Sequence, residues 1–308
     1  MTDWRQFLAD KKPWCLTEGD CTAVLPLLPD ACLDSVVCDP PYPEVSRPYG
    51  RLSVREWFRL MKAVVPECMR ALKPTGSAVF ILQPNSERVG RMRTWLWDFM
   101  GWAGRRWGIV QDAWWWNHAA LPEAHAIQGR LLRCSLKACV WLGLPNCYRS
   151  QEAVLWSESN ANVALRASAR LGRSESPSGQ SVTAKTISGA AVRRGGVTPF
   201  NVLPIANTNS NSSAGANGHG AGTPLPLCSW WVRYLTPAGG LVCDPFAGSA
   251  TVGVAALKSG RRFLGCERMP EYVVIARRRL LNAGLTKDET YEGPGAELPL
   301  FDAAGATG

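Results

Sequence analysis

Short apolar runs alternate with stretches of helical periodicity along most of this chain, and several of the runs stop abruptly at an acidic residue. Residues 34–38 form one such run, which ends at Asp39 and two prolines that cannot continue a strand ladder. Residues 55–72 then carry apolar side chains at helical spacing, and residues 77–82 form the next apolar run. Strands that alternate with helices in this way are typical of an α/β protein with a largely parallel sheet.

The same periodicities predict the other elements. A helix stop followed by a turn is expected at residues 73–76, where Lys-Pro-Thr-Gly interrupts the pattern. We further expect helix over most of residues 88–107, strands at residues 113–116, 138–142, 241–243 and 262–266, and helices at residues 251–258 and 270–282, with Gly284 just past the last helix.

The composition changes in the middle of the chain. From residue 157 to residue 199, and again from 206 to 222, Ser, Ala, Gly, Asn and Arg dominate and large apolar side chains almost vanish. Such stretches cannot bury enough apolar surface to order themselves alone. We therefore predict one domain built from residues 1–156 and 223–285, with a flexible insertion at 157–222 and a flexible tail at 286–308.

Charge and cysteine content narrow the class of protein. The 34 Lys and Arg exceed the 25 Asp and Glu by nine, which fits a polyanionic partner such as nucleic acid, or a basic protein without one. The 11 cysteines contain no C-x-x-C pair, which argues against a disulfide framework or a zinc ribbon and favours a reducing cytoplasm. The first 12 residues lack an apolar signal core, and no apolar run approaches the roughly 18–20 residues that span a bilayer. We expect no membrane segment and no metal site.

Residues 39–42, with the sequence Asp-Pro-Pro-Tyr, lie at the predicted strand end, where open α/β sheets bind ligands. An exocyclic amine is a poor nucleophile because its lone pair is delocalised into the ring. The Asp39 carboxylate and the Pro40 carbonyl could each accept one N–H of such an amine and free its lone pair, while Pro41 keeps the turn rigid. Tyr42 offers a flat face for an extruded base. The alternative is an ordinary strand end followed by a Pro-Pro turn.

A second motif lies at residues 244–251, with the sequence Asp-Pro-Phe-Ala-Gly-Ser-Ala-Thr, between a predicted strand and a predicted helix. Small residues let the backbone approach a bulky ligand, and the free N–H groups at the helix start favour a carboxylate. The next predicted strand ends in Glu267, which is placed to bind a ribose diol. A glycine-rich turn alone is weak evidence for any one cofactor, and the whole combination is considerably stronger.

From residue 18 to residue 281 the sequence resembles the amino-methylating DNA methyltransferases (adenine-N6 or cytosine-N4), in their β arrangement. Residues 25–42 are similar to the family's "L-x-x-L-P-D … S-V-D … D-P-P-Y" stretch, and residues 240–279 to its "G-x-x-V-x-D-P-F-x-G-S-x-T … G-R-R-F-x-G-x-E … A-x-R-R-L" stretch. The family also places the D-P-P-Y motif before the cofactor motif, as this chain does.

This resemblance implies a Rossmann-like sheet that uses S-adenosylmethionine to methylate double-stranded DNA. It also implies that the insertion at residues 157–222 is the target-recognition region, with a solvated charged linker as the alternative. It implies a target-base site at Asp39, Pro40, Pro41 and Tyr42, and a cofactor site at Asp20, Asp244, Pro245, Phe246, Gly248, Ser249, Thr251 and Glu267. For Asp20 a helix cap is an equally simple explanation. Two positions depart from the family pattern, since Ala250 replaces its second glycine and Pro43 stands where many adenine enzymes carry Asn. The acidic first residue favours adenine, and cytosine remains the alternative.

Other readings remain open at this point. The same fold could serve an RNA or protein methyltransferase, or a catalytically silent DNA-binding regulator. Within residues 88–107 we favour tryptophans in the core and solvated arginines over a nucleic-acid surface, and we expect at least one of Trp114–Trp116 in the core. A separate restriction nuclease could be a partner, because no nuclease motif is apparent. The tail resembles a sliding-clamp peptide at Glu297, Leu298, Leu300 and Phe301, with a strand folded back on the domain as the alternative.

Overall fold

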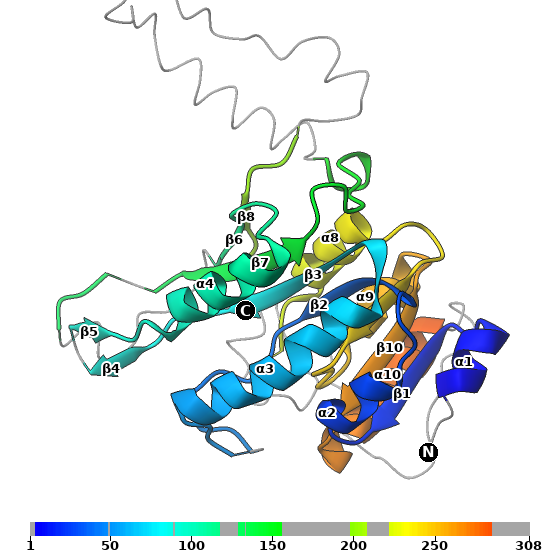
Figure 1. Cartoon of the computed structure of the whole chain (residues 1–308), viewed down its shortest axis with the longest axis horizontal. Helices are drawn as coiled ribbons and strands as arrows, with labels where there is room; N and C mark the ends of the chain where they lie inside the picture. The colour runs from blue at the N-terminus through cyan, green and yellow to red at the C-terminus, as the bar shows by residue number, and fades with distance from the viewer. Residues whose placement is uncertain are drawn as a thin grey trace, which may run out of the picture.

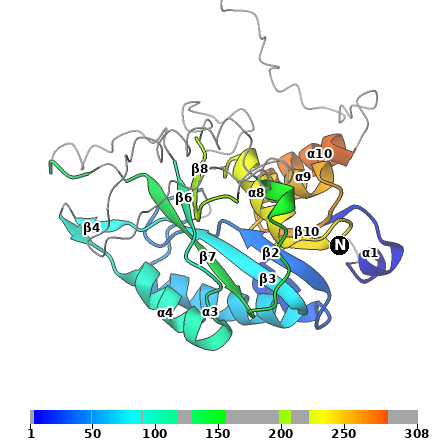
Figure 2. The same ribbon diagram turned by 90° about the horizontal axis from the view of Figure 1, so that it is seen from above.

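The fold is an eight-stranded sheet with helices on both faces (Figures 1 and 2). The computed structural model describes residues 4–48, 50–88, 90–117, 129–132, 134–155, 198–207 and 222–284. Across the sheet the strand order is β1-β10-β9-β2-β3-β7-β6-β8. The predicted α/β architecture is therefore confirmed.

The strands are mostly parallel. Every neighbouring pair from β1 to β3 is parallel, β7 runs antiparallel to both β3 and β6, and β8 is parallel to β6. The strands are β1 (Trp14–Glu18), β2 (Leu33–Cys38), β3 (Leu72–Leu82), β6 (Trp114–Trp116), β7 (Leu136–Gly143), β8 (Val202–Pro204), β9 (Leu241–Asp244) and β10 (Arg262–Glu267). Because β9 lies between β2 and β10, the two halves of the chain interleave in one sheet and bring their strand ends to the same edge.

Alternation along the strands creates two hydrophobic cores, one on each face of the sheet. On β2, Val36 and Cys38 point into the first core and Val37 into the second. Figure 2 shows α3 and α4 on one side of the sheet and α8, α9 and α10 on the other. The helices of the first face are α1 (Trp4–Asp10), α2 (Cys21–Val24), α3 (Val54–Ala71) and α4 (Trp95–Trp107), and those of the second are α8 (Leu225–Leu235), α9 (Thr251–Lys258) and α10 (Pro270–Gly284).

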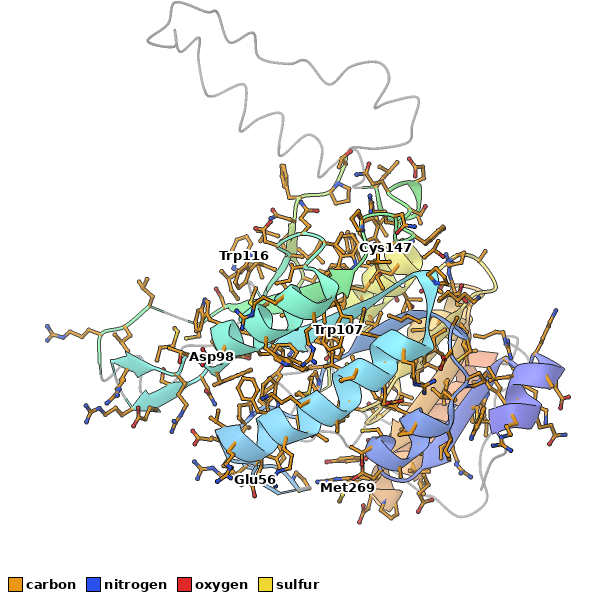
Figure 3. All side chains as sticks on the ribbon, in the orientation of Figure 1. Glu56, Asp98, Trp107, Trp116, Cys147 and Met269 are labelled. Atoms are coloured by element: carbon orange, nitrogen blue, oxygen red, sulfur yellow. The ribbon has the colours of Figure 1, made fainter. Side chains whose placement is uncertain are left out.

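The start of α3 is fixed by its own sequence. The Ser53 hydroxyl accepts the Glu56 N–H, and the Glu56 carboxylate (Figure 3) accepts the Ser53 N–H, which completes a capping box. The first turn also carries Trp57, which is fully buried and packs edge-on against Trp95 of α4. The cap and this contact orient α3 so that its buried face covers β2, and Trp57 reaches the loop after β2.

Two local predictions were wrong. Residues 73–76 form no separate turn but belong to β3, whose pairing with β2 shifts register between Leu33 and Ser35. Pro74 lies in this irregular part, where it interrupts no ladder bond. Residues 88–94 are not helical, because β4 (Ser86–Arg88) and β5 (Arg91–Met92) form a hairpin with Gly90 between them at a φ of 77°. In Figure 1 this hairpin projects beyond the sheet.

The tryptophan-rich segments divide between core and surface. Trp95 and Trp115 are buried, Trp97 and Trp116 (Figure 3) are exposed, and the Trp115 indole donates to the Ile205 carbonyl at 2.7 Å. Arg105 and Arg106 at the end of α4 are exposed as well. The predicted core position is confirmed for Trp95 and for one residue of β6, and it is wrong for Trp97, which lies on the surface of α4.

Part of the predicted insertion belongs to the sheet. Residues 202–204 form β8, and the described segment around it binds both ends of β6 through backbone hydrogen bonds. Residues 157–197 and 208–221 of the insertion fall outside the described part of the chain, as does the clamp-like segment at 297–301. The domain boundaries predicted from composition therefore stay predictions.

Candidate functional site

A cavity of about 1110 Å³ lies at the carboxyl ends of β1, β10, β9 and β2. All twelve residues that the sequence singled out line this one cavity. They are Asp39, Pro40, Pro41 and Tyr42 from the first motif, Asp244, Pro245, Phe246, Gly248, Ser249 and Thr251 from the second, and Asp20 and Glu267 from the neighbouring strand ends. Residues more than 200 positions apart thus share one site because β9 and β2 are neighbours in the sheet.

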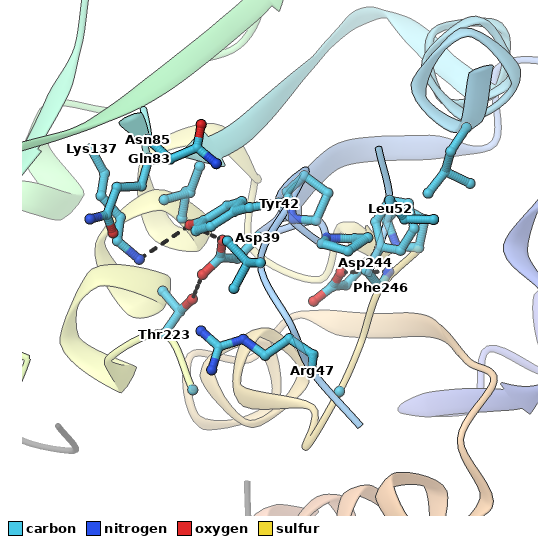
Figure 4. Close-up of a pocket in the computed structure, with 18 of the residues that line it drawn as sticks. Asp39, Tyr42, Arg47, Leu52, Gln83, Asn85, Lys137, Thr223, Asp244 and Phe246 are labelled. Carbon is cyan, nitrogen blue, oxygen red and sulfur yellow. Dashed lines mark hydrogen bonds between the residues drawn. The ribbon is translucent and has the colours of Figure 1, made fainter. Parts of the chain in front are cut away.

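The Asp39 carboxylate accepts two hydroxyl groups. The Tyr42 hydroxyl donates to Oδ1, and the Thr223 hydroxyl donates to Oδ2 at 2.5 Å (Figure 4). The Lys137 ammonium lies 3.2 Å from the Tyr42 oxygen and also faces the Tyr42 and Trp115 rings. An ammonium group can only donate, so the Tyr42 oxygen accepts from Lys137 and directs its own proton to Asp39.

Two side-chain donors bind backbone carbonyl groups of the loop after Asp39 and fix its position. The buried Trp57 indole donates to the Pro41 carbonyl at 2.6 Å, and the Asn85 amide donates to the Pro43 carbonyl at 2.7 Å. The Asn85 amide is itself oriented, because its oxygen accepts the Trp95 indole N–H at 2.7 Å. No donor among the described residues binds the Pro40 carbonyl. The loop therefore offers that carbonyl and the Asp39 carboxylate as acceptors beside the cavity.

At the end of β9, Asp244 is almost completely buried, with 3% of its surface exposed. Its carboxylate accepts the Phe246 N–H at 3.0 Å. Burial raises the pKa of Asp244 to about 8, with smaller contributions from the nearby Asp39 and Glu267 carboxylates, and the Phe246 hydrogen bond opposes the rise. Such a carboxyl would be stabilised in its charged form by a cation placed in the cavity.

The loop after Asp244 folds around the Glu267 carboxylate. The Gly248 N–H and the Met269 N–H each donate to one of its oxygens at 2.8 Å. Gly248 has a φ of 53°, a left-handed conformation that glycine adopts without strain. The carboxylate is thereby fixed at the cavity wall, and its remaining lone pairs can accept from hydroxyl donors such as a ribose diol.

Arg279 of α10 ties the same loop to the domain. Its guanidinium donates to the Ser249 carbonyl at 2.5 Å, to the Ser249 hydroxyl at 2.7 Å and to the Thr251 hydroxyl at 3.1 Å. Burial lowers the pKa of Arg279. Ser249 and Thr251 line the cavity as predicted, but their hydroxyls accept from this arginine, to which the sequence analysis gave no role.

Asp20 caps a helix and also lies at the cavity, while its predicted contact with a cofactor stays a prediction. Its carboxylate accepts the N–H and the hydroxyl of Thr22, at 2.8 Å and 2.7 Å, and so caps α2, while the residue also lines the cavity. Ala250 has a φ of 58° and its side chain is buried in the core under α9. It does not appear among the described residues that line the cavity.

Sequence reasoning missed Thr223, Lys137, Asn85 and Trp57. Thr223 directly precedes Pro224 and α8, so a helix start was the only local signal for it. Lys137 lies on β7 and Asn85 follows β3, and neither strand has a composition that indicates a site. The order of strands in the sheet brings both side chains to the loop after Asp39. The described residues contain no cluster of three or more potential metal ligands. None of the helices in the described part of the chain has the length and apolar character to cross a membrane.

Comparison with known proteins identifies the family. A family model described as DNA methylase, for adenine-N6 and cytosine-N4 enzymes, matches residues 33–278. The chain belongs to this family. The resemblance drawn from the two motifs is thereby confirmed.

Similar proteins differ in how much of the chain they match. The type II methyltransferase M.PvuII of Proteus hauseri is 26% identical over 301 residues, which cover 88% of this chain and 84% of that protein. The type II methyltransferase M2.DpnII of Streptococcus pneumoniae is 51% identical over 45 residues, and the DNA adenine methyltransferase YhdJ of Escherichia coli K12 is 52% identical over 42 residues. These two matches cover 17% and 14% of the relatives and 15% and 14% of this chain.

Solved structures confirm the fold. The PvuII DNA methyltransferase, described as cytosine-N4-specific, aligns with a TM-score of 0.66 at 20% identity and covers 90% of this chain and 89% of its own. A DNA modification methylase from Thermus thermophilus, solved with S-adenosylmethionine, aligns with a TM-score of 0.56 at 21% identity and covers 87% of this chain and 95% of its own. At these identities the likeness establishes a common Rossmann-like architecture.

Proposed function

We propose that this protein transfers a methyl group from S-adenosylmethionine to the N6 amino group of adenine in double-stranded DNA. The observation that carries the proposal is the shared cavity, in which the Asp39 carboxylate and the Pro40 carbonyl lie beside the loop between Asp244 and Glu267. An acceptor pair for one amine and a cradle for a ribose-containing cofactor therefore face the same space.

The residues of the second motif fit that cofactor by their chemistry. Glu267, held by two backbone N–H groups, would accept the ribose hydroxyls. Gly248 adds no side chain at the cavity wall, and the buried Asp244 would favour a cationic ligand. Asp20 at the neighbouring strand end adds a further acceptor. When bound, S-adenosylmethionine supplies an electrophilic methyl group on a positively charged sulfur.

The first motif would prepare the nucleophile. Asp39 and Pro40 would each accept one N–H of the target amine, which draws the nitrogen toward tetrahedral geometry and frees its lone pair. Trp57 and Asn85 hold the neighbouring carbonyls, so the Pro40 carbonyl stays in place while the base enters. Tyr42 would stack on the extruded base. The extra amine proton can leave after transfer, when the nitrogen has become acidic, so no covalent enzyme intermediate is required.

Cytosine-N4 is the second candidate. It is favoured by the likeness to the PvuII enzyme, whose description gives that specificity. The acidic residue at position 39 favours adenine. Because both bases carry an exocyclic amine with two N–H donors, the acceptor pair alone serves either one.

The test is to express the chain in a bacterium without DNA methylation and to sequence its genome by a method that reports modified bases. The matched variants are Asp39→Ala and Asp10→Ala, the latter removing an exposed carboxylate far from the cavity. We expect N6-methyladenine in a repeated motif with the wild type and Asp10→Ala, and none with Asp39→Ala. N4-methylcytosine in the same pattern would reassign the base. Unmodified DNA from folded, cofactor-binding wild type would refute the proposal and favour an RNA or protein substrate or the silent regulator.

A further inference from the structure

Thr223 makes a hydrogen bond that the proposed reaction does not yet use. Its hydroxyl donates to Asp39 Oδ2 at 2.5 Å across 184 positions of sequence, and its side chain is almost fully buried (Figure 4). The residue directly precedes α8, which packs against β2 and α9. Its hydroxyl is thus placed by the part of the chain that leads to β9 and Asp244, and it contacts the motif at the end of β2.

The two bonds to Asp39 differ in what substrate entry would do to them. The hydroxyl on Oδ1 belongs to Tyr42, whose ring is half-buried and is the expected stacking surface for the base. An incoming amine needs a carboxylate oxygen and can replace the Tyr42 hydroxyl there. The hydroxyl on Oδ2 belongs to Thr223, which adjoins a packed helix and has no stacking role that would move it.

We propose that Thr223 is a positioning residue, which fixes the rotation of the Asp39 carboxylate so that Oδ1 receives the target amine. The inference rests on the proposed amino-methyltransferase function. A carboxylate held at one oxygen cannot turn freely about its Cβ–Cγ bond, so its second oxygen keeps one direction. Thr223 also links the target-base loop to the half of the domain that would hold the cofactor.

The test compares Thr223→Val, which removes the hydroxyl with little change of shape, with Thr223→Ser, which keeps it. Thr236→Val is the matched control, because Thr236 is fully buried and its hydroxyl bonds the Ser35 hydroxyl at 2.7 Å, outside the residues that line the cavity. For each variant kcat, KM for DNA, the Kd for S-adenosylmethionine and the melting temperature are measured on the full chain, with wild type and Asp39→Ala in parallel.

We expect Thr223→Val to lower kcat roughly 10- to 100-fold, the scale of a misplaced reacting group, with KM and the cofactor Kd changed less than threefold. Thr223→Ser should retain kcat within threefold, and Thr236→Val should lower the melting temperature and leave kcat unchanged. The inference is overturned if Thr223→Val keeps wild-type kcat, if Ser does not rescue, or if kcat falls only in step with cofactor binding or folding. If the wild type itself leaves DNA unmodified, the proposed function fails, which is a different result from an active wild type matched by Thr223→Val.

Discussion

Replacing Asp244 with asparagine would show how strongly the folded protein disfavours a charge at the end of β9. The amide has the shape of a protonated carboxyl, and its oxygen can still accept the Phe246 N–H. Burial raises the pKa of Asp244 from its ordinary 3.8 to about 8. Between these values the folded state holds a proton that the unfolded state has lost, so the free energy of unfolding falls as pH rises. The stability that the protonated Asp244 contributes to the folded state is fully present below about pH 4 and is lost as pH rises through about 8.

The size of the effect follows from the same pKa. At about 1.36 kcal/mol per pKa unit, the interval from pH 5 to pH 8 is worth on the order of 4 kcal/mol. We expect wild type to lose that much more stability over this interval than Asp244→Asn does. Groups that titrate in both proteins cancel in the difference. The nearby Asp39 and Glu267 carboxylates remain in both, so the comparison isolates Asp244.

The assay is urea unfolding followed by tryptophan fluorescence at pH 5, 6, 7 and 8, with reductant and without cofactor. Asp10→Asn serves as the control. Among the described residues this exposed carboxylate is paired only with Lys12, at 3.6 Å, so the stability curve of the variant should run parallel to that of wild type. If the wild-type and Asp244→Asn curves stay parallel within about 1 kcal/mol, burial does not raise the pKa of Asp244 and the reasoning is refuted.

Two further predictions concern the loop after β2. Tyr42→Phe keeps the stacking face and should lower kcat/KM less than tenfold. Tyr42→Ala loses the face and should lower kcat/KM roughly 10- to 100-fold, because stacking of a base contributes about 1–3 kcal/mol. Equal losses for the two variants in steady-state assays would contradict a stacking role. Trp57→Phe leaves the half-buried Pro41 carbonyl without its donor and should destabilise the fold by about 1–3 kcal/mol in thermal unfolding and lower kcat as well. Unchanged kcat with that loss of stability would limit Trp57 to packing.

The sequence predicted the order of the elements and the cavity lining well, because both depend on local patterns. The parallel strands β1, β2, β9 and β10 each end at or just before an acidic residue, and in a parallel sheet such ends meet at one edge. The sequence pattern alone therefore predicted that Asp39 and Asp244 lie at the same edge of the sheet. The hairpin at Ser86–Met92 was missed because its residues give a weak strand pattern, and Gly90 was the one local sign of a turn.

The residues that support the site could not be predicted, because their roles depend on contacts far along the chain. Thr223 bonds Asp39 across 184 positions, and Trp57 reaches Pro41 only because α3 lies over β2. Lys137 meets Tyr42 because β7 joins the sheet beside β3. A side chain with an ordinary local pattern gains a functional position from sheet order, which motif spacing does not contain.

Ala250 shows how a departure from the family pattern can leave the site intact. The backbone there has a φ of 58° and a ψ of 40°, which lie in the left-handed region. Glycine adopts this region without strain, which accounts for the glycine in the family pattern. Holding alanine in this region costs roughly 1–2 kcal/mol. Its fully buried methyl group returns about 0.8 kcal/mol by leaving water, and alanine also restricts the unfolded chain more than glycine does. These contributions nearly cancel, and the methyl group packs into the core under α9, away from the cavity. The alanine at this position therefore leaves the described lining of the cavity unchanged.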